Sequence, residues 1–277
     1  MDLAKLIKRG RETRPRRVLL YGPHGIGKST WPSLAPKPIY LQTEDGLADI
    51  GVDRTPVLRS KLEVAQWLLF LSGDEDHGYQ TLVIDTLDWL EKLIWEALAH
   101  SEQKDSIEDF GFGKGYVKAA ESWDKLLRHL DLCREAKGMN IVLLAHAKVE
   151  KFSPPDNDAY DRWSPDLHKL ASALVQEWCD EVLFATTEIH TIKQEAGFKK
   201  EITRAVGEGD RIVQTAGGKP TFAAKRRIEL PDEMPLAWSE YAKHWPTGNG
   251  SAGNVSGVVV DGSSKTSKAK GKSNESG

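Results

Sequence analysis

The chain has 277 residues, 39% of them hydrophobic and 29% charged, which is typical of one globular α/β domain with appendages. The formal net charge of −3 excludes a strong overall basic field, so nucleic-acid binding would need local patches. Cys133 and Cys179 are too few for a disulfide framework, and we expect them to be core thiols in a reducing compartment. No apolar run is long enough to span a membrane, and no apolar segment follows the basic N-terminus, so we expect a cytoplasmic protein.

The composition changes along the chain and predicts three segments. Residues 1–15 form a short basic arm. The first 17 residues hold seven cations: Lys5, Lys8, Arg9, Arg11, Arg14, Arg16 and Arg17. Residues 16–245 form the core. Residues 246–277 are rich in Gly, Ser and Lys, and their apolar content is too low to offset the entropy of ordering, so we expect a disordered tail.

Within the core, short apolar runs alternate with helical patterns. We expect strands at 16–22, 37–43, 80–85, 139–147 and 180–193. We expect helices at 60–73, 86–100 and 166–179, and one whose apolar face includes Ala120, Trp123, Leu127, Leu130 and Cys133. Segment 211–230 predicts a hairpin turning at Gly217 and Gly218. The alternation predicts an α/β fold: a mostly parallel sheet with helices on both faces and a C-terminal antiparallel hairpin.

Residues 22–30, "GPHGIGKST", match the phosphate-binding pattern G-x-x-x-x-G-K-[ST] directly after the first expected strand. Glycines let backbone N–H groups turn around phosphate oxygens, and the helix expected from near Gly27 would point its positive end at the same anion. Lys28 would reach the β- and γ-phosphates, and the Ser29 hydroxyl would ligate Mg²⁺. The expected nucleotide-binding residues are Gly22, Pro23, His24, Gly25, Ile26, Gly27, Lys28, Ser29 and Thr30. The alternative is a glycine-rich turn without a ligand.

Two carboxylates are candidates for the chemistry beside this loop. Asp85 ends an apolar strand, as expected for a residue on the Mg²⁺ shell, although it could instead cap the following helix. Thr86 follows it where many mechanical ATPases carry a catalytic glutamate. We therefore expect the general base to be Glu44, at the end of the strand that follows the phosphate-binding loop and its helix. The alternatives are that Glu44 is a solvated turn acid or that Asp45 is the base.

Polar residues at two later positions complete the candidate set. His146 ends the strand at 139–147 and could sense the γ-phosphate, or could simply be a hydrogen-bonded structural residue. On an expected strand, Lys225 and Arg227 would point to one face, where cations can stabilise phosphoryl transfer. By spacing alone, a solvated edge strand, whose cations discourage unwanted pairing, is the better explanation of these two cations.

These pieces, in this order, resemble the RecA-type recombinase core over roughly residues 16–245. Within that group the chain is similar to phage RecA-core single-strand annealing proteins, the Sak-like P-loop NTPases of AAA_24 type. The segments that indicate this branch are "TEDGL" (43–47), "FGFGKGY" (110–116) and "AAKRRIELP" (223–231). The resemblance implies a RecA-like fold, ATP and Mg²⁺ as cofactors, and a homo-oligomer.

By position, the resemblance makes Glu44 the catalytic glutamate and gives His146 the place of a γ-phosphate sensor, which is often glutamine. It also makes Lys225 and Arg227 paired cations that act across a subunit interface. The chain departs from the family in having prolines that shorten the helix after the loop, Pro32, Pro36 and Pro38. It also lacks the recombinase N-terminal oligomerisation domain, so a filament is not implied.

The resemblance places single-stranded DNA on two loops, 101–116 and 148–166, which mix aromatic and cationic residues. Bases stack on such rings while cations follow the phosphates. The candidate DNA contacts are Phe112, Lys114, Lys148, Lys151 and Trp163. The second loop also carries acids that would repel a DNA backbone, and ordinary surface loops are the alternative.

The resulting hypothesis is a Mg²⁺-dependent ATPase that binds single-stranded DNA and promotes annealing or strand exchange, with a single-strand-binding protein as a further expected partner. Without an N-K-x-D motif, guanine is disfavoured. One alternative is a P-loop small-molecule kinase, but the segment 148–166 has only Arg162 where an arginine-rich lid would be needed. The other is a non-hydrolysing ATP-dependent loader or interaction module.

Overall fold

The computed structural model describes residues 7, 10, 12–188, 190–195, 201–206, 209–216 and 221–245. Most of the expected basic arm and all of the expected tail, residues 246–277, lie outside these residues. Within the described part, every helix is too short or too polar to cross a bilayer.

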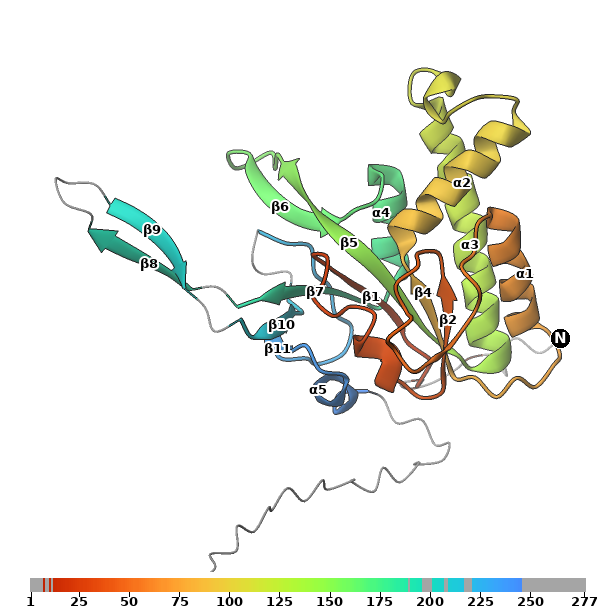
Figure 1. The fold of residues 1–277 in the computed structure, drawn as a ribbon, viewed down its shortest axis with the longest axis horizontal. Helices are drawn as coiled ribbons and strands as arrows, with labels where there is room; N and C mark the ends of the chain where they lie inside the picture. The colour runs from red at the N-terminus through yellow and green to blue at the C-terminus, as the bar shows by residue number, and fades with distance from the viewer. Residues whose placement is uncertain are drawn as a thin grey trace, which may run out of the picture. The chain divides into compact units, whose positions relative to one another are not determined.

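A nine-stranded sheet lies at the centre, in the order β11-β10-β7-β1-β5-β4-β2-β3, with β6 paired to β5 (Figure 1). Its strands are β1 (Arg17–Gly22), β2 (Pro38–Gln42), β3 (Asp53–Arg54), β4 (Thr81–Asp85), β5 (Asn140–Phe152), β6 (Tyr160–Pro165), β7 (Glu181–Thr187), β10 (Arg211–Gln214) and β11 (Glu233–Pro235). From β7 to β3 neighbouring strands are parallel, whereas β10 is antiparallel to both β7 and β11. The mostly parallel α/β sheet predicted from the sequence is confirmed.

The strand register brings several candidate residues to one edge of the sheet. Gly22, at the end of β1, lies beside His146 of β5. Asp85, at the end of β4, lies beside Gln42 of β2 and Leu144 of β5. Ligands of open α/β sheets bind outside the carboxyl ends of the strands, so this edge is the expected place for a site.

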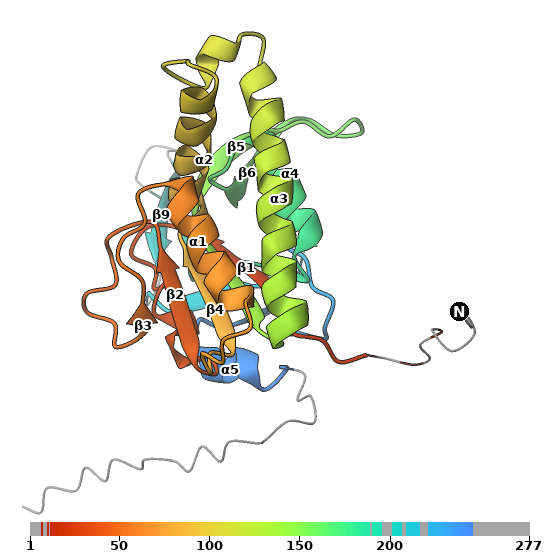
Figure 2. The same cartoon turned by 90° about the vertical axis from the view of Figure 1, so that its right-hand side faces the viewer.

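One face of the sheet is covered by α1 (Lys61–Ser72), α2 (Leu87–Ser101), α3 (Lys114–Lys137) and α4 (Lys169–Trp178) (Figure 2). Alternate strand residues such as Leu19 and Leu143 point to this face and pack with the fully buried Trp123 of α3. The Ser60 side chain caps α1 by accepting the N–H of Glu63 at 3.2 Å. Cys133 and Cys179 are buried, as expected for core thiols.

The other face is covered by shorter elements, η2 (Trp31–Leu34, a 3₁₀ helix) and α5 (Trp238–Ala242), whose aromatic side chains pack together. The helix expected from Gly27 is therefore wrong. One turn forms, in which the Trp31 N–H donates to the Gly27 carbonyl at 3.1 Å, before the 3₁₀ segment. The chain becomes extended at Ala35 because the following residue, Pro36, disfavours helical backbone before it.

The terminal antiparallel pairing is confirmed, but its second strand was predicted at the wrong place. β10 pairs with β11, not with residues 221–230, and the expected turn at Gly217 and Gly218 lies outside the described residues. Segment 221–229 crosses the sheet with isolated bridges, from Phe222 to Trp163 and from Lys225 to Val182. Met234 of β11 is buried in the second-face core, which favours this pairing over the local one.

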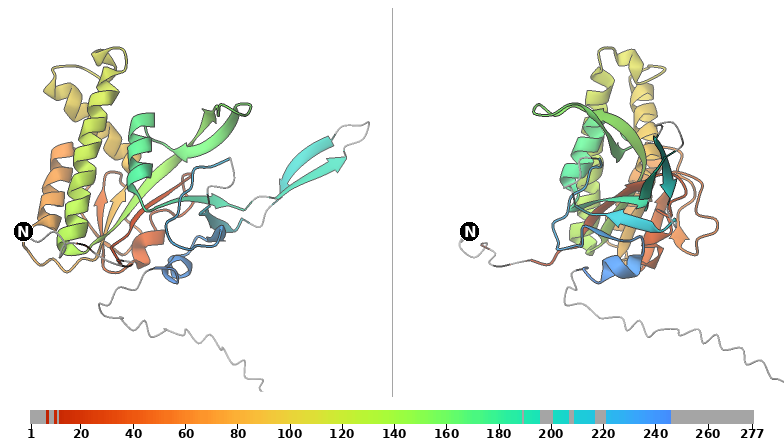
Figure 3. Two further views of the ribbon diagram at one scale, coloured as in Figure 1. Left: turned by 180° about the vertical axis from the view of Figure 1, so that it is seen from behind. Right: turned by 90° about the vertical axis from the view of Figure 1, so that its left-hand side faces the viewer.

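Two hairpins extend beyond the parallel strands (Figures 1 and 3). Segment 148–166, expected as a loop, is instead the continuation of β5 paired antiparallel with β6, and we call residues 148–165 the β5–β6 arm. Ring contact between Phe152 and Tyr160, with centroids 5.5 Å apart, stabilises this pairing. The strand expected at 180–193 ends at Thr187, and β8 (His190–Glu195) pairs with β9 (Glu201–Val206) in a separate two-stranded sheet.

Candidate nucleotide-binding site

Residues 22–30, here called the P-loop, connect β1 to η2 at the carboxyl edge of the sheet. Gly25 and Gly27 have φ values of 72° and 105°, which L side chains rarely adopt, so the path of the loop needs glycine at these positions. The Lys28 ammonium is buried and donates to the carbonyls of Gly22 at 3.1 Å and Pro23 at 2.9 Å. Burial lowers the pKa of Lys28, and the nearby Asp85 opposes that shift.

Ser29 and Asp85 lie together, and their oxygens fit a magnesium ion. Burial raises the pKa of the Asp85 carboxyl to about 6, and the nearby Ser29 side chain opposes that shift. Mg²⁺ prefers hard oxygen ligands and is usually held by one or two protein groups plus substrate phosphates. Within the described residues no cluster of three or more His, Cys, Asp or Glu side chains could hold a metal ion.

Glu44 lies beside this pair. Just before it, the Thr43 N–H donates to the Asp85 carbonyl at 2.8 Å, which fixes the end of β2 next to the end of β4. The Thr86 hydroxyl donates to Glu44 Oε2 at 3.4 Å, and the Glu44 charge contributes to the raised pKa of Asp85. Asp45 is exposed, whereas Glu44 is half-buried against the site.

His146 lies at the same edge, in contact with both the P-loop and α2. Its ring stacks on the ring of His24, with centroids 3.7 Å apart. Its Nδ1 is 2.9 Å from Asp88 Oδ2, and its backbone N–H donates to Asp88 Oδ1 at 3.1 Å. Burial alone would raise the pKa of Asp88, but the hydrogen bonds from His146 bring it below its ordinary value.

Asp88 is a site residue that we did not single out from the sequence. It lies in the first turn of α2, three residues after Asp85, on the helix that begins where β4 ends. A second carboxylate at this spacing, directly after a buried strand, was a usable signal because one helical turn returns it toward the sheet edge. The bond from His146 to Asp88 is consistent with the structural alternative for His146 as well as with a γ-phosphate sensor.

Lys225 and Arg227 are not part of this site within one chain. The Lys225 backbone pairs with Val182, near the start of β7 and thus at the opposite, amino edge of the sheet. Its ammonium donates to the carbonyls of Gln176 and Glu177 at the end of α4, at 2.9 and 2.8 Å. Arg227 is paired with Asp180 at 3.1 Å. The expected strand, with both cations on one face, does not form because the segment makes only single bridges here.

The candidate DNA contacts lie in two places. Phe112 is fully exposed, and Lys114 follows as the first, exposed residue of α3. In the β5–β6 arm, Lys151 is exposed, whereas the Lys148 ammonium donates to the Leu167 carbonyl and pairs with Asp166.

Trp163 is 36% exposed and is also held by contacts within the chain. Its ring lies against Phe184, with centroids 5.9 Å apart. The backbone N–H of Trp163 donates to the Thr221 carbonyl at 2.8 Å, and the Trp163 carbonyl accepts the backbone N–H of Ala223 at 3.1 Å. Trp163 therefore anchors the arm to the segment that crosses the sheet.

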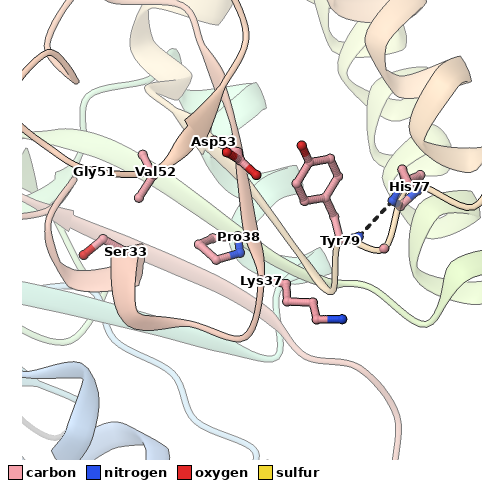
Figure 4. Close-up of a pocket in the computed structure, with 9 residues that line it drawn as sticks. Ser33, Lys37, Pro38, Gly51, Val52, Asp53, His77 and Tyr79 are labelled. Atoms are coloured by element: carbon pink, nitrogen blue, oxygen red, sulfur yellow. Dashed lines mark hydrogen bonds between the residues drawn. The ribbon is translucent and has the colours of Figure 1, made fainter. Parts of the chain in front are cut away.

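A separate cleft of about 740 Å³ opens near the amino ends of β2 and β4 (Figure 4). It is lined by residues that include Lys37, Asp53, His77 and Tyr79. Pro38 begins β2 and Tyr79 lies just before β4, whereas the P-loop lies at the opposite ends of these strands. This cleft is therefore distinct from the candidate nucleotide site.

Comparison with known proteins gives three results. Residues 14–228 match the AAA_24 family, described as an AAA domain. The SPbeta prophage-derived uncharacterized protein YorG of Bacillus subtilis (strain 168) is 26% identical over 141 residues, and the match covers 48% of this chain and 42% of that protein. The RadB recombinase crystal structure aligns with 15% identity and a TM-score of 0.38, covering 74% of this chain and 82% of that chain. Because the family match spans most of the sequence, the chain belongs to the AAA_24 family of AAA domains.

Proposed function

We propose that this protein is a Mg²⁺-dependent ATPase that binds single-stranded DNA and promotes annealing or strand exchange. The observation that supports it most is the convergence of Lys28, Asp85 and Glu44 at the carboxyl edge of the sheet, beside a glycine loop with the phosphate-binding sequence pattern. Membership of the AAA_24 family supports a P-loop ATPase.

In the proposed reaction, the P-loop amides and Lys28 hold the phosphates of ATP. A water oxygen attacks the γ-phosphorus, and its proton passes to Glu44. The bond from that phosphorus to the bridging oxygen breaks, and the electron pair stays on ADP. Bound Mg²⁺, with Ser29 and Asp85 as its protein ligands, would supply charge neutralisation.

The DNA part of the proposal is supported by the two exposed regions that combine rings and cations, around Phe112 and along the β5–β6 arm. Phe110 shows the same combination, because the ammonium groups of Lys104 and Lys118 lie 5.1 and 5.4 Å from its ring. We further propose a homo-oligomer in the host-cell cytoplasm, in which Lys225 and Arg227 face a neighbouring subunit, and a single-strand-binding protein as partner.

The test is ATP hydrolysis with and without single-stranded DNA, for the unchanged protein, Lys28→Ala and the exposed control Lys125→Ala. We expect turnover that DNA stimulates, lost in Lys28→Ala and retained in the control. Unchanged turnover in Lys28→Ala would contradict the site assignment. Turnover indifferent to DNA would instead favour a kinase, and tight ATP binding without turnover would favour a loader.

A further inference from the structure

An arginine that the sequence patterns did not single out lies at the P-loop. Arg211 is the first residue of β10, and the antiparallel register places it beside Thr187, at the end of β7. The carboxyl edge of the parallel sheet, where the P-loop lies, is therefore also where Arg211 lies. A methyl group placed on Gly27 would be 3.2 Å from Arg211 Nη1.

Hydrogen bonds to the neighbouring strands fix the backbone at Arg211, and so they fix the position of Arg211 near the P-loop. Its carbonyl accepts the Leu236 N–H at 2.8 Å, and the preceding carbonyl, of Asp210, accepts the Glu188 N–H at 2.8 Å. The Leu236 side chain also lies against Gly27, 3.8 Å from the same methyl position. A side chain at Gly27 would thus meet the guanidinium and an apolar group in addition to being strained by its φ of 105°.

The balance of charges around the P-loop favours a second cation such as Arg211 beside the phosphates. Three carboxylates, Asp85, Asp88 and Glu44, act on the buried Lys28. Phosphoryl transfer needs further positive charge on the transferred group and the leaving oxygen. In the same chain Lys225 and Arg227 lie at the opposite edge, bonded to α4 and to Asp180.

Arg211 also differs from the neighbouring arginines in being available. Arg226 pairs with Asp232 at 2.9 Å and Arg227 with Asp180 at 3.1 Å. Among the described residues, the exposed Arg211 guanidinium has no hydrogen-bond or ion-pair partner. A guanidinium presents its donors in a planar fork that matches two phosphate oxygens.

We propose that Arg211 contacts the phosphate chain of the bound nucleotide within its own chain, as a catalytic residue that stabilises the charge of the transferred phosphoryl group. This inference rests on the proposed function for its catalytic part, whereas the phosphate contact itself can be tested by binding alone. This contact would make the start of β10 a functional part of the P-loop site.

The experiment compares the full chain with Arg211→Ala, Arg211→Lys and Arg128→Ala, an exposed arginine of α3, in equilibrium binding of ATP and ADP with Mg²⁺ and in steady-state hydrolysis. Arg211→Ala should weaken nucleotide affinity at least about tenfold and lower kcat at least about a hundredfold. Arg211→Lys should recover part of each loss because charge returns without the fork, and Arg128→Ala should match the unchanged protein. Equal unfolding temperatures would exclude a folding defect.

The outcomes separate this inference from the proposed function. Affinity and kcat of Arg211→Ala within twofold of the unchanged protein would overturn the role of Arg211 and leave the ATPase intact. If the unchanged protein binds ATP without hydrolysing it, the ATPase proposal fails, and the affinity of Arg211→Ala still decides the phosphate contact. Absence of nucleotide binding by the unchanged protein would overturn both.

Discussion

The imidazole ring of His24 lies on the imidazole ring of His146, with centroids 3.7 Å apart and planes 23° from parallel. His24 belongs to the P-loop, and His146 ends the buried part of β5, where it is hydrogen-bonded to Asp88 of α2. The stacked rings therefore connect the P-loop to β5, and the bond from His146 to Asp88 extends this connection to α2.

We expect His24→Ala to weaken ATP affinity by less than about tenfold, because an aromatic pair contributes roughly 0.5–1.5 kcal/mol and the loop amides remain. Equilibrium titration with ATP measures the effect. His129→Ala, which removes a histidine whose ring hydrogen-bonds the Lys125 carbonyl of the same helix, is the matched control. Loss of all binding in His24→Ala would show that the ring itself is essential to the loop, contrary to this prediction.

Glu44→Gln should retain ATP binding and lose at least about a hundredfold in kcat, because an amide cannot accept the proton of the attacking water. Single-turnover hydrolysis and ATP titration measure the two effects separately. Asp45→Asn, one residue away and exposed, should hydrolyse ATP normally. The reverse result, with Asp45→Asn inactive, would move the base to Asp45.

Asp85→Asn should raise the Mg²⁺ concentration for half-maximal hydrolysis by at least about tenfold, because it removes a charged oxygen ligand. Burial raises the pKa of Asp85 to about 6, so removing this charge should not lower the free energy of unfolding at pH 7. Magnesium titrations and denaturant unfolding measure these quantities. An unchanged magnesium requirement, with Asp124→Asn as the surface control, is the result that would falsify the ligand assignment.

A buried carboxyl on α2 predicts how stability depends on pH. Burial raises the pKa of Glu91 from 4.5 to about 7, despite the hydrogen bond that it accepts from the His168 N–H at 2.8 Å. The folded state therefore binds more protons than the unfolded state between about pH 4.5 and 7, and stability falls as pH rises through that window.

Glu91→Gln removes this dependence while keeping an acceptor for His168. The free energy of unfolding of Glu91→Gln, minus that of the unchanged protein, should rise as pH increases from 4.5 to 8, by up to about 3 kcal/mol. Denaturant unfolding across that range measures the change, with the exposed Glu121→Gln as control. Parallel pH curves for the two proteins would contradict the prediction.

Phe112→Ala should weaken single-stranded DNA binding by about tenfold, because one base stacked on a ring contributes roughly 1–3 kcal/mol. Phe112→Trp should retain binding. Fluorescence anisotropy with an oligonucleotide at fixed salt measures both, and Trp89→Ala, another exposed aromatic residue, is the control. Equal affinity in Phe112→Ala and the unchanged protein would remove this region from the proposed DNA path.

The central strands could be predicted because each is a short apolar run that ends at a polar residue or a glycine in the sequence. Asp85 at the end of β4 and Gly22 at the end of β1 are examples, and the parallel sheet then places them at one edge. The P-loop residues follow from a local pattern, which the fold preserves even though the expected helix is replaced by a turn and a 3₁₀ segment.

Features that depend on distant pairing could not be predicted in this way. The spacing of Lys225 and Arg227 does not indicate at which edge of the sheet they lie. Their position is set by the backbone bridge between Lys225 and Val182. Arg211 reaches Gly27 only because β10 pairs antiparallel with β7, and the local glycine turn signal indicated a different partner for β10. Long-range packing of residues such as Met234 selects among these pairings.

Strand β5 runs without a break from Asn140 in the sheet to Phe152 in the arm. At about 3.3 Å per residue, the stretch from His146 to Phe152 is roughly 20 Å long. This stretch contains no loop and no glycine, the places where hinges are often found. If β5 rotated at His146, which stacks on the P-loop, the displacement at the ring of Phe152 would therefore be larger than at His146.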